Sequence, residues 1–389
     1  MALSRLRAGF ARIGMVLAAC LWAFSASAQL FETKAGQAYL IDADTGTVLF
    51  SKDPDKLIPP ASLAKLMTME LVFDALRAGR YTRETTFQIS ENAWRTGGAP
   101  SRTSTMFAEI NSIVPLGELM QGAIVISAND ACIAIAEGMA GSEENFATMM
   151  TERARKLGLS KSVFTNSTGL PADGQFVTVR ELATLAQHIW RTYPEFYPLY
   201  SQLEYKWNKI NQQNRNPLLR MDIGADGLKT GFTEESGFAI VGSVARDGKR
   251  LFVAMSGMAT DKERAEESRK LLDWGMRSFN KVDIFGADET VGEAKMFGGE
   301  KSRVKLTAKG PISMLVPIAN RDRVIARIVY EGPVEAPVEA GAPVGKLKVW
   351  VGDLLTQETP LYAAESIAVG SLHQRAFDAI EELAIGWLR

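Results

Sequence analysis

The stretch PPASLAKLMTMELVFDAL, residues 59–76, predicts the start of a buried helix. Its two prolines stop the preceding extended chain, and apolar residues then recur at helical intervals from Ser62 onward. Ser62 and Lys65 are three residues apart, so their side chains lie on one helix face within hydrogen-bond reach. A serine becomes a nucleophile when a base accepts its proton, and a lysine with a lowered pKa can do this. The pattern S-x-x-K is weak evidence by itself, because it recurs at 278–281 and 302–305.

The composition excludes several classes of chemistry. The chain has 389 residues, of which 46% are hydrophobic and 23% charged, as in ordinary globular proteins with two or three cores. It has two histidines (His188, His373), two cysteines (Cys20, Cys132) and no H-E-x-x-H or C-x-x-C pair, so we expect neither a zinc site nor a disulfide framework. The net charge of −1, without a basic run, argues against nucleic acid as a partner. Proton transfer would rest mainly on lysine, carboxylate or tyrosine side chains.

The N-terminal segment has the features of a secretory signal peptide. Residues 1–14 carry three arginines and no acid, an apolar stretch follows, and A-S-A at 26–28 forms a cleavage site. The apolar run is about half of the ~20 residues that a membrane-spanning helix needs. L-A-A-C at 17–20 looks like a lipoprotein cleavage box, but the apolar core continues past Cys20, which favours cleavage after Ala28. We therefore predict that residues 1–28 are removed on export.

The pattern from residue 29 to about 280 predicts one α/β domain. Residues 38–51 predict a hairpin around the turn D-T-G. Helical periodicity marks 116–139, 143–157, 179–191 and 261–279, and alternation marks strands at 237–244 and 251–257. The first helical stretch is interrupted near 127–130, where small polar residues favour a turn. This order of strands and helices indicates a sheet packed on helices.

Beyond residue 280 the character of the sequence changes. Short β-branched runs at 303–307, 312–318, 323–330 and 347–351, separated by glycine and proline turns, predict a small β domain over 281–370. Within it, the tandem P-V-E-A at 333–340 is predicted to be a loop. The last segment, 371–389, predicts an amphipathic helix with one apolar face, made by Leu372, Ala376, Ile380, Leu383 and Trp387.

Two further tripeptides could share a site with Ser62 and Lys65. S-x-N occurs three times, but only S-A-N at 127–129 breaks an apolar helical stretch, as a loop projecting into a cleft between helices would. K-T-G occurs once, at 229–231, ahead of the strand pattern. A cation and a hydroxyl on a strand edge suit an anionic end of a substrate, and the glycine lets a ligand approach the backbone closely. Each tripeptide by itself is most simply interpreted as a helix cap, a turn or a strand end. The order of the three motifs along the chain is therefore the stronger indication of function.

The order S-x-x-K, S-x-N, K-T-G on a helix start, a helix break and a strand resembles the signature of penicillin-binding proteins and serine β-lactamases. The chain resembles the serine-type D-alanyl-D-alanine carboxypeptidases, which are low-molecular-mass penicillin-binding proteins of the penicillin-binding protein 5 and 6 group. The likeness extends over the whole chain after residue 28, through PPASLAKLMT, ISANDACIAIAEGMAGSEENF, LGLSKSVFTNSTGLPADGQFVT, NRNPLL, GLKTGFT and ERAEESRKLLDWG. It implies a transpeptidase-like α/β (α+β) catalytic domain over 29–280, an all-β domain over 281–370 and a membrane-associating amphipathic helix over 371–389.

The resemblance also implies a role for each motif residue. Ser62 is the acylated nucleophile, and Lys65 is its general base, with a pKa lowered by burial and a nearby cation. Ser127 relays a proton to the leaving amine. Asn129 holds the substrate amide and orients the lysine.

The substrate's anionic end and the oxyanion would be held by a second group of residues. Lys229 and Thr230, with Arg264 from ERAEES, would receive the terminal D-Ala carboxylate, and Gly231 would allow close approach. Backbone N–H groups of the nucleophile and of Phe232 would hold the oxyanion, where a preorganised donor is typically worth ~3 kcal/mol. The family often has histidine where this chain has Phe232, so only the backbone amide of that residue is given a role.

Three other features have less specific interpretations. Cys132 matches a cysteine that the family carries near the active site, although a small buried packing residue is the simpler interpretation. His188 lies in a helical pattern and is interpreted as structural. The terminal helix resembles a peripheral membrane anchor, with docking on its own β domain as the alternative. Because it carries one more acid than base, insertion would depend on its apolar side chains Phe377, Leu383, Trp387 and Leu388.

The function that follows is removal of the terminal D-alanine from peptidoglycan pentapeptides through a Ser62 acyl-enzyme, which would regulate cell-wall cross-linking. This reaction would require no metal and no organic cofactor. β-Lactams would inhibit it covalently, and it would lie in the periplasm at the outer face of the inner membrane. A D,D-endopeptidase of the same fold and a non-enzymatic peptidoglycan-binding envelope protein are alternatives. A class A β-lactamase is another, but it needs a deacylating glutamate, usually in E-x-x-L-N, and that string does not occur.

Overall fold

A computed structural model of the protein describes residues 31–319 and 323–385. The predicted signal peptide at 1–28, with its lipobox-like segment, lies outside these residues. In the N-terminal part, antiparallel strands form one sheet in the order β2-β1-β9-β8-β7, so β7 lies at an edge. The strands are β1 (Gln37–Asp42), β2 (Val48–Lys52), β7 (Ala225–Thr233), β8 (Gly237–Arg246) and β9 (Lys249–Met258).

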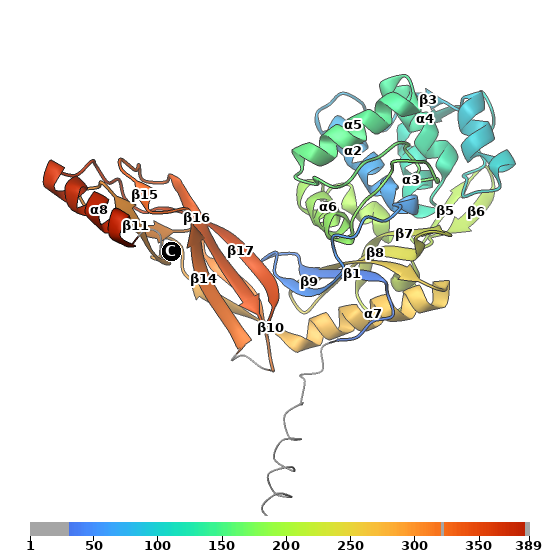
Figure 1. The fold of residues 1–389 in the computed structure, drawn as a ribbon. Coiled ribbons are helices and arrows are strands. Elements are labelled where there is room, and N and C mark those ends of the chain that lie inside the picture. The colour runs from blue at the N-terminus through green and yellow to red at the C-terminus, as the bar shows by residue number, and fades with distance from the viewer. Residues whose placement is uncertain (1–30, 320–322, 386–389) are drawn as a thin grey trace, which may run out of the picture. The chain divides into compact units, whose positions relative to one another are not determined.

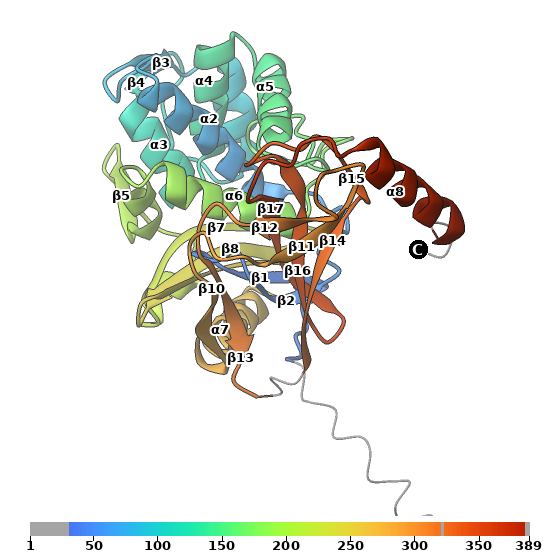
Figure 2. The ribbon, with the colours of Figure 1, turned by 90° about the vertical axis from the view of Figure 1, so that its left-hand side faces the viewer.

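Helices lie on both sides of this sheet. One side carries α2 to α6, and the other carries α7, as the two views show (Figures 1 and 2). Of these, α6 packs on β1 and β9, and α7 packs on β8 and β9. The helices are α2 (Lys65–Arg77), α3 (Leu116–Val125), α4 (Asn129–Ala140), α5 (Glu143–Lys156), α6 (Val179–Thr192) and α7 (Asp261–Ser278). Side chains of Ser142, Thr178 and Thr260 cap the last three by accepting a backbone N–H, which satisfies an otherwise unpaired donor.

The predicted helix start and helix break are both confirmed, with added detail. A 3-10 turn, Ala61–Ala64, precedes α2, so Ser62 lies in this tighter turn and Lys65 is the first α-helical residue. Between α3 and α4, Ser127 has a left-handed φ of 65°. A Cβ atom on Gly97 would lie 2.4 Å from the backbone nitrogen of Asp130, so main chain packs directly on this break. The S-A-N segment is therefore held inside the helical layer.

Several short elements were not predicted. The hairpin at 38–51 is confirmed by the pairing of β1 with β2. Two further hairpins join β3 (Thr86–Gln88) to β4 (Ile113–Pro115) and β5 (Glu204–Trp207) to β6 (Ile210–Gln213). Strands of three or four residues are too short to show the alternation on which a sequence-based prediction depends.

The C-terminal part of the chain has a hydrophobic core of its own. In it, β10 (Phe279–Phe285) pairs with β13 (Ile312–Pro317), and further strands form a sheet in the order β14-β16-β17-β12-β11-β15. Side chains such as Ala294, Met296 and Leu306 build the core. The predicted domain limits at 28, 280 and 370 stay predictions. The strands are β11 (Gly292–Phe297), β12 (Arg303–Thr307), β14 (Val324–Tyr330), β15 (Val334–Glu335), β16 (Pro343–Val351) and β17 (Leu354–Ala363).

The loop predicted for the tandem P-V-E-A is interrupted by a short strand. Val334 and Glu335 form β15, which pairs in parallel with Met296 and Phe297 of β11. Val338 forms a further bridge with Ile367. The remaining residues of the segment form no strand, so the pairing with β11 and Ile367 adds to a loop that is otherwise present.

The terminal helix α8 (Leu372–Ile385) turns apolar side chains outward. Leu372, Phe377, Ile380 and Leu383 are each at least 64% exposed. On its other side, the Asp378 carboxylate accepts the backbone N–H of Gly298, with an N–O distance of 2.7 Å. In the part of the chain that the structure describes, no helix combines the length and hydropathy required to cross a membrane.

Candidate active site

The serine and lysine of S-x-x-K lie together at the start of α2. Lys65 Nζ is 3.0 Å from Ser62 Oγ, and the lysine side chain is almost fully buried. Its nitrogen also donates to Asn129 Oδ1 and to the carbonyl of Thr168, each at 2.7 Å. Three acceptors therefore fix the position of the amine beside the hydroxyl.

The environment of Lys65 favours its neutral form. Burial lowers the pKa of Lys65 to about 8, against the opposing effects of Cys132, Glu143 and Asp130. A carboxylate or thiolate nearby favours the charged amine, whereas removal from water disfavours it, and here burial is the larger effect. A lysine in this state can accept the hydroxyl proton near neutral pH.

The S-A-N segment supplies the second side of the site. Asn129 donates its Nδ2 to Thr103 Oγ1 at 2.9 Å, so its Oδ1 is directed at Lys65. Asp130, fully buried, accepts from Thr105 Oγ1 at 2.6 Å and from the backbone N–H of Met106 at 3.0 Å. The carboxylate thus ties the loop that carries Thr103 to the start of α4.

The carbonyl that binds Lys65 belongs to a turn that the sequence did not single out. Asn166 Oδ1 accepts the backbone N–H of both Thr168 and Gly169, at 3.2 and 2.7 Å. Gly169 has φ of 79°, and a Cβ atom there would lie 1.7 Å from the carbonyl oxygen of Ala61. The run N-S-T-G contains typical turn residues, which was the available signal.

The K-T-G residues lie on edge strand β7, next to Ser62. A Cβ atom on Gly231 would lie 2.9 Å from Ala61 Cβ and 3.3 Å from the Ser62 nitrogen, so only glycine fits this contact. Lys229 and Thr230 are both at least 94% buried. Burial, and then the charge of Lys65, hold the pKa of Lys229 well below its usual range.

Phe232 and Arg264 extend the site from β7 to α7. The Phe232 side chain is 53% exposed, and its ring centroid lies 4.4 Å from that of Phe238. Arg264 is buried, and its guanidinium lies 5.6 Å from the Phe238 centroid. Its Nε has no hydrogen-bond partner among the residues described, although Asp261 forms an ion pair with the guanidinium.

Other cations also act on Lys229. After burial and Lys65, the charges of Arg264 and Arg215 lower the pKa of Lys229 further. Arg215, in the segment N-R-N-P-L-L, was not predicted as a site residue. Lys229 and Arg264 are buried cations, and buried cations suit an anion.

The other residues weighed in the sequence lie outside the hydrogen-bonded centre. Cys132 is fully buried, and burial raises its pKa to about 11, so it remains a thiol. His188 Nε2 lies 3.2 Å from Oε1 of the buried Glu70 carboxylate, which Arg153 also binds through two nitrogens. Within 31–319 and 323–385, no three His, Cys, Asp or Glu side chains are grouped as metal ligands would be.

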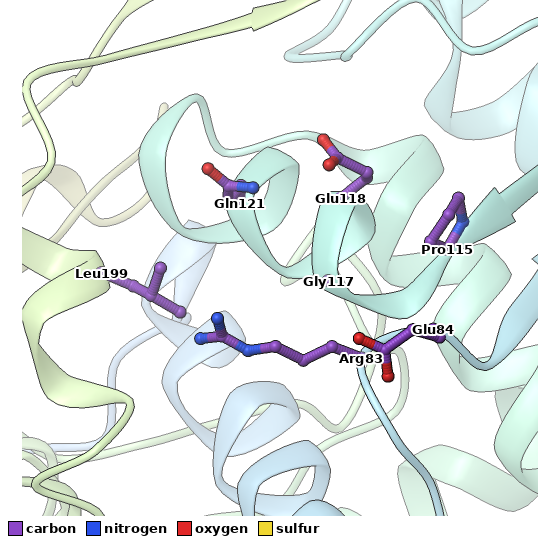
Figure 3. A pocket seen from close by; sticks show the side chains of 7 residues that line it. All are labelled: Arg83, Glu84, Pro115, Gly117, Glu118, Gln121 and Leu199. Atoms are coloured by element: carbon purple, nitrogen blue, oxygen red, sulfur yellow. The ribbon is translucent and has the colours of Figure 1, made fainter.

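A separate pocket of about 390 Å³ lies by the start of α3 (Figure 3). Arg83 and Leu199 point into the space below that helix, and Glu118 and Gln121 project from it. None of the nine predicted site residues lines this pocket. The chemistry therefore concentrates where α2, the S-A-N segment and β7 meet.

Known proteins are similar to this chain in both sequence and fold. Residues 23–260 match the family described as D-alanyl-D-alanine carboxypeptidase, and residues 279–369 match the one described as penicillin-binding protein 5, C-terminal domain. D-alanyl-D-alanine carboxypeptidase DacC of Escherichia coli (strain K12) is 35% identical over 344 residues, which are 88% of this chain and 86% of that protein.

Solved structures agree with this. Penicillin binding protein 5 from Haemophilus influenzae aligns with a TM-score of 0.74 and 32% identity, over 87% of this chain and 99% of that one. Penicillin-binding protein D2 from Listeria monocytogenes, in its ampicillin-bound form, aligns with a TM-score of 0.58 and 28% identity, over 64% of this chain and all of that one. The predicted fold, an α/β domain followed by an all-β domain, is confirmed by these matches.

Proposed function

Because the chain belongs to the D-alanyl-D-alanine carboxypeptidase family, we propose that it removes the terminal D-alanine from peptidoglycan pentapeptides through a Ser62 acyl-enzyme. The observation that carries this is the 3.0 Å contact between Lys65 Nζ and Ser62 Oγ, with the pKa of the lysine lowered to about 8. A nucleophile and its base are thus already within hydrogen-bond reach.

In acylation, Ser62 Oγ attacks the carbonyl carbon of the penultimate D-alanine, and its proton passes to Lys65 Nζ. The carbonyl oxygen becomes an oxyanion, which the backbone N–H groups of Ser62 and Phe232 stabilise. The C–N bond then breaks, and the leaving amine takes the proton from Lys65 Nζ, relayed through Ser127, so the lysine is neutral again. Asn129, which contacts Lys65, holds the substrate amide.

The same groups serve deacylation. A water molecule gives a proton to the Lys65 amine and attacks the ester carbonyl, and Ser62 Oγ regains a proton when the C–O bond breaks. The terminal carboxylate of the pentapeptide is held before cleavage by Thr230, Lys229 and Arg264. The support for Arg264 is that its guanidinium lies over the Phe238 ring, which packs on the ring of Phe232 beside K-T-G.

The experiment is incubation of the protein, purified without residues 1–28, with a pentapeptide ending in D-Ala-D-Ala, beside Ser62→Ala. We expect stoichiometric release of free D-alanine by the wild-type chain and none by the variant. Covalent labelling by penicillin should likewise need Ser62, since a β-lactam acylates the same oxygen. Release by Ser62→Ala at the wild-type rate would refute the assignment.

We also propose that the protein is exported and lies at the outer surface of the inner membrane through α8. The support is the N-terminal signal pattern and the exposed apolar residues Leu372, Phe377 and Leu383. Sedimentation with lipid vesicles tests the attachment. The chain should sediment, whereas one that ends at residue 370 should stay in solution.

A further inference from the structure

The direction of the Lys65 lone pair decides whether the amine can accept the Ser62 proton, and two carbonyl oxygens set this direction. A neutral amine carries two N–H bonds and one lone pair. Asn129 Oδ1 and the carbonyl oxygen of Thr168 each lie 2.7 Å from Lys65 Nζ, and Ser62 Oγ lies 3.0 Å from it. Carbonyl oxygens only accept hydrogen bonds, whereas a hydroxyl can also donate. The two carbonyls therefore take the two N–H bonds, which leaves the lone pair for the O–H of Ser62.

Only one of these two carbonyls belongs to a motif. Asn129 is part of S-A-N, but the Thr168 oxygen belongs to the main chain of the turn 166–169. Its direction is therefore set by the groups that hold this turn against α2. Two side chains that the mechanism above does not use hold the turn, Thr68 and Asn166.

Thr68 holds the turn from the helix side. It lies three residues after Lys65 on α2, so the two side chains lie on one helix face. Its Oγ1 donates to the carbonyl of Ser167 at 2.6 Å, and its side chain is fully buried. Two successive carbonyls of the turn, those of Ser167 and Thr168, thus accept hydrogen bonds from the same face of α2.

Asn166 holds the opposite side of the same two peptide groups. Its Oδ1 accepts the N–H of Thr168 at 3.2 Å and the N–H of Gly169 at 2.7 Å. In a trans peptide group the N–H and the C=O point in opposite directions. Because Asn166 binds both N–H groups, both carbonyls are turned toward α2.

The same arrangement suits the lysine after it has accepted the proton. The ammonium group has three N–H bonds, and the new one lies where the lone pair was, between Nζ and Ser62 Oγ. The carbonyls of Asn129 and Thr168 keep their N–H bonds in both states. The amine therefore need not rotate between accepting the proton and releasing it.

We propose that Thr68 and Asn166 are positioning residues for the general base. By holding the turn 166–169 between them, they direct the Thr168 carbonyl at Lys65 and so aim the lone pair at Ser62. They act through the main chain and take no part in the making or breaking of bonds. This inference rests on the proposed function, because it concerns the same acylation step.

Variants of the two residues separate this role from a contribution to folding. Thr68→Val removes the hydroxyl and keeps the shape of the side chain, whereas Thr68→Ser keeps the hydroxyl. Asn166→Leu removes the acceptor on the other side of the turn. The control is Thr356→Val, because Thr356 is also buried and its Oγ1 donates to the carbonyl of Val349 at 3.0 Å, in the C-terminal sheet.

The measurement is the first-order rate constant of covalent labelling at a saturating concentration of fluorescent penicillin, between pH 6 and pH 10. Saturation separates the acylation step from binding, and the amplitude of labelling reports the folded fraction. Because the rate constant is a property of the molecules that label, a partial loss of folded protein leaves it unchanged.

Thr68→Val and Asn166→Leu should label roughly ten- to a hundredfold more slowly than wild type on the plateau above about pH 9, where protonation of the amine no longer limits the rate. Thr68→Ser should stay within about threefold of wild type, and Thr356→Val should match it. The pH midpoint of Thr68→Val should also move down, because displacing an acceptor disfavours the charged amine more than the neutral one.

A wild-type rate constant on the plateau in either Thr68→Val or Asn166→Leu would overturn the inference and leave the proposed function standing. A Thr68→Ser variant as slow as Thr68→Val would do the same, since the hydroxyl would then not be the group responsible. Failure of the wild-type chain both to label with penicillin and to release D-alanine from the pentapeptide would overturn the proposed function, and this inference with it.

Discussion

The rate of acylation should follow the titration of Lys65. With its pKa lowered by burial from 10.5 to about 8, about 9% of the amine is neutral at pH 7, whereas about 0.03% would be neutral at the ordinary value. Burial therefore raises the reactive fraction about 300-fold, which corresponds to about 3.4 kcal/mol. Because the neutral amine is the base, the rate should rise about tenfold per pH unit below pH 7 and level off above about pH 9.

Glu143 offers a way to move this titration. Its charge raises the pKa of Lys65, and its Oε1 accepts the N–H and the O–H of Ser167 at 3.0 and 2.6 Å. Glu143→Gln removes the charge but keeps a carbonyl acceptor for Ser167. The pKa of Lys65 should then fall further, so the midpoint of the profile should move to lower pH. The adjacent, exposed Glu144 provides the matched control, Glu144→Gln.

The assay is the rate of covalent labelling by a fluorescent penicillin between pH 6 and pH 10, with Ser62→Ala as the blank. Glu143→Gln should be faster than wild type at pH 6 to 7 and equal to it on the plateau, and Glu144→Gln should match wild type throughout. A wild-type profile without a rise between pH 6 and pH 8, or a midpoint that moves upward in Glu143→Gln, would refute the reasoning.

Three further substitutions have defined outcomes. Gly231→Ala brings a Cβ atom to 2.9 Å from Ala61 Cβ, and the overpacking should cost about 1–3 kcal/mol. Penicillin labelling of this variant should therefore be slower than that of the wild type by roughly tenfold or more. The control is Gly310→Ala, whose new Cβ atom meets open space and should leave the labelling rate unchanged. Arg153→Met leaves the buried Glu70 carboxylate without its arginine partner. The free energy of unfolding, measured with urea, should fall by about 3–5 kcal/mol. An unchanged midpoint of the urea unfolding curve would contradict this. Phe232→Ala keeps the backbone amide and should label within about threefold of wild type, so a much larger loss would mean that the ring itself takes part.

The main parts of the site could be predicted because each motif has a local structural signature. The spacing of Ser62 and Lys65, the interruption before Asn129 and the strand pattern after Gly231 are all visible within about ten residues. The order of the three then pointed to one family, and the structure brings the three segments into contact.

The supporting residues could not be predicted in the same way. Thr168 binds Lys65 across 103 residues of chain, and Thr103 binds Asn129 across 26. Contacts of this kind arise from tertiary packing, and no periodicity of the sequence marks them. Arg215 was missed because a lone arginine in a polar loop looks the same whether or not it lies near a buried lysine.

The short strand within the P-V-E-A segment was missed for a related reason. Its prolines are typical of loops, and most of the segment is a loop, but Val334 and Glu335 form β15. Pairing of Val334 with Met296 decides between the two, and this depends on a strand almost forty residues away.

Gly97, Gly169 and Gly231 surround the nucleophile and its neighbouring loop with main-chain contacts that leave no room for a β-carbon. At these glycines, even the smallest added side chain would displace main-chain atoms, so substitutions there cannot change the geometry of the active site by small steps. Changes of side chain that alter what the protein accepts are therefore expected at positions farther from the nucleophile. The covalent chemistry and the choice of substrate can in this way diverge independently as the sequence changes.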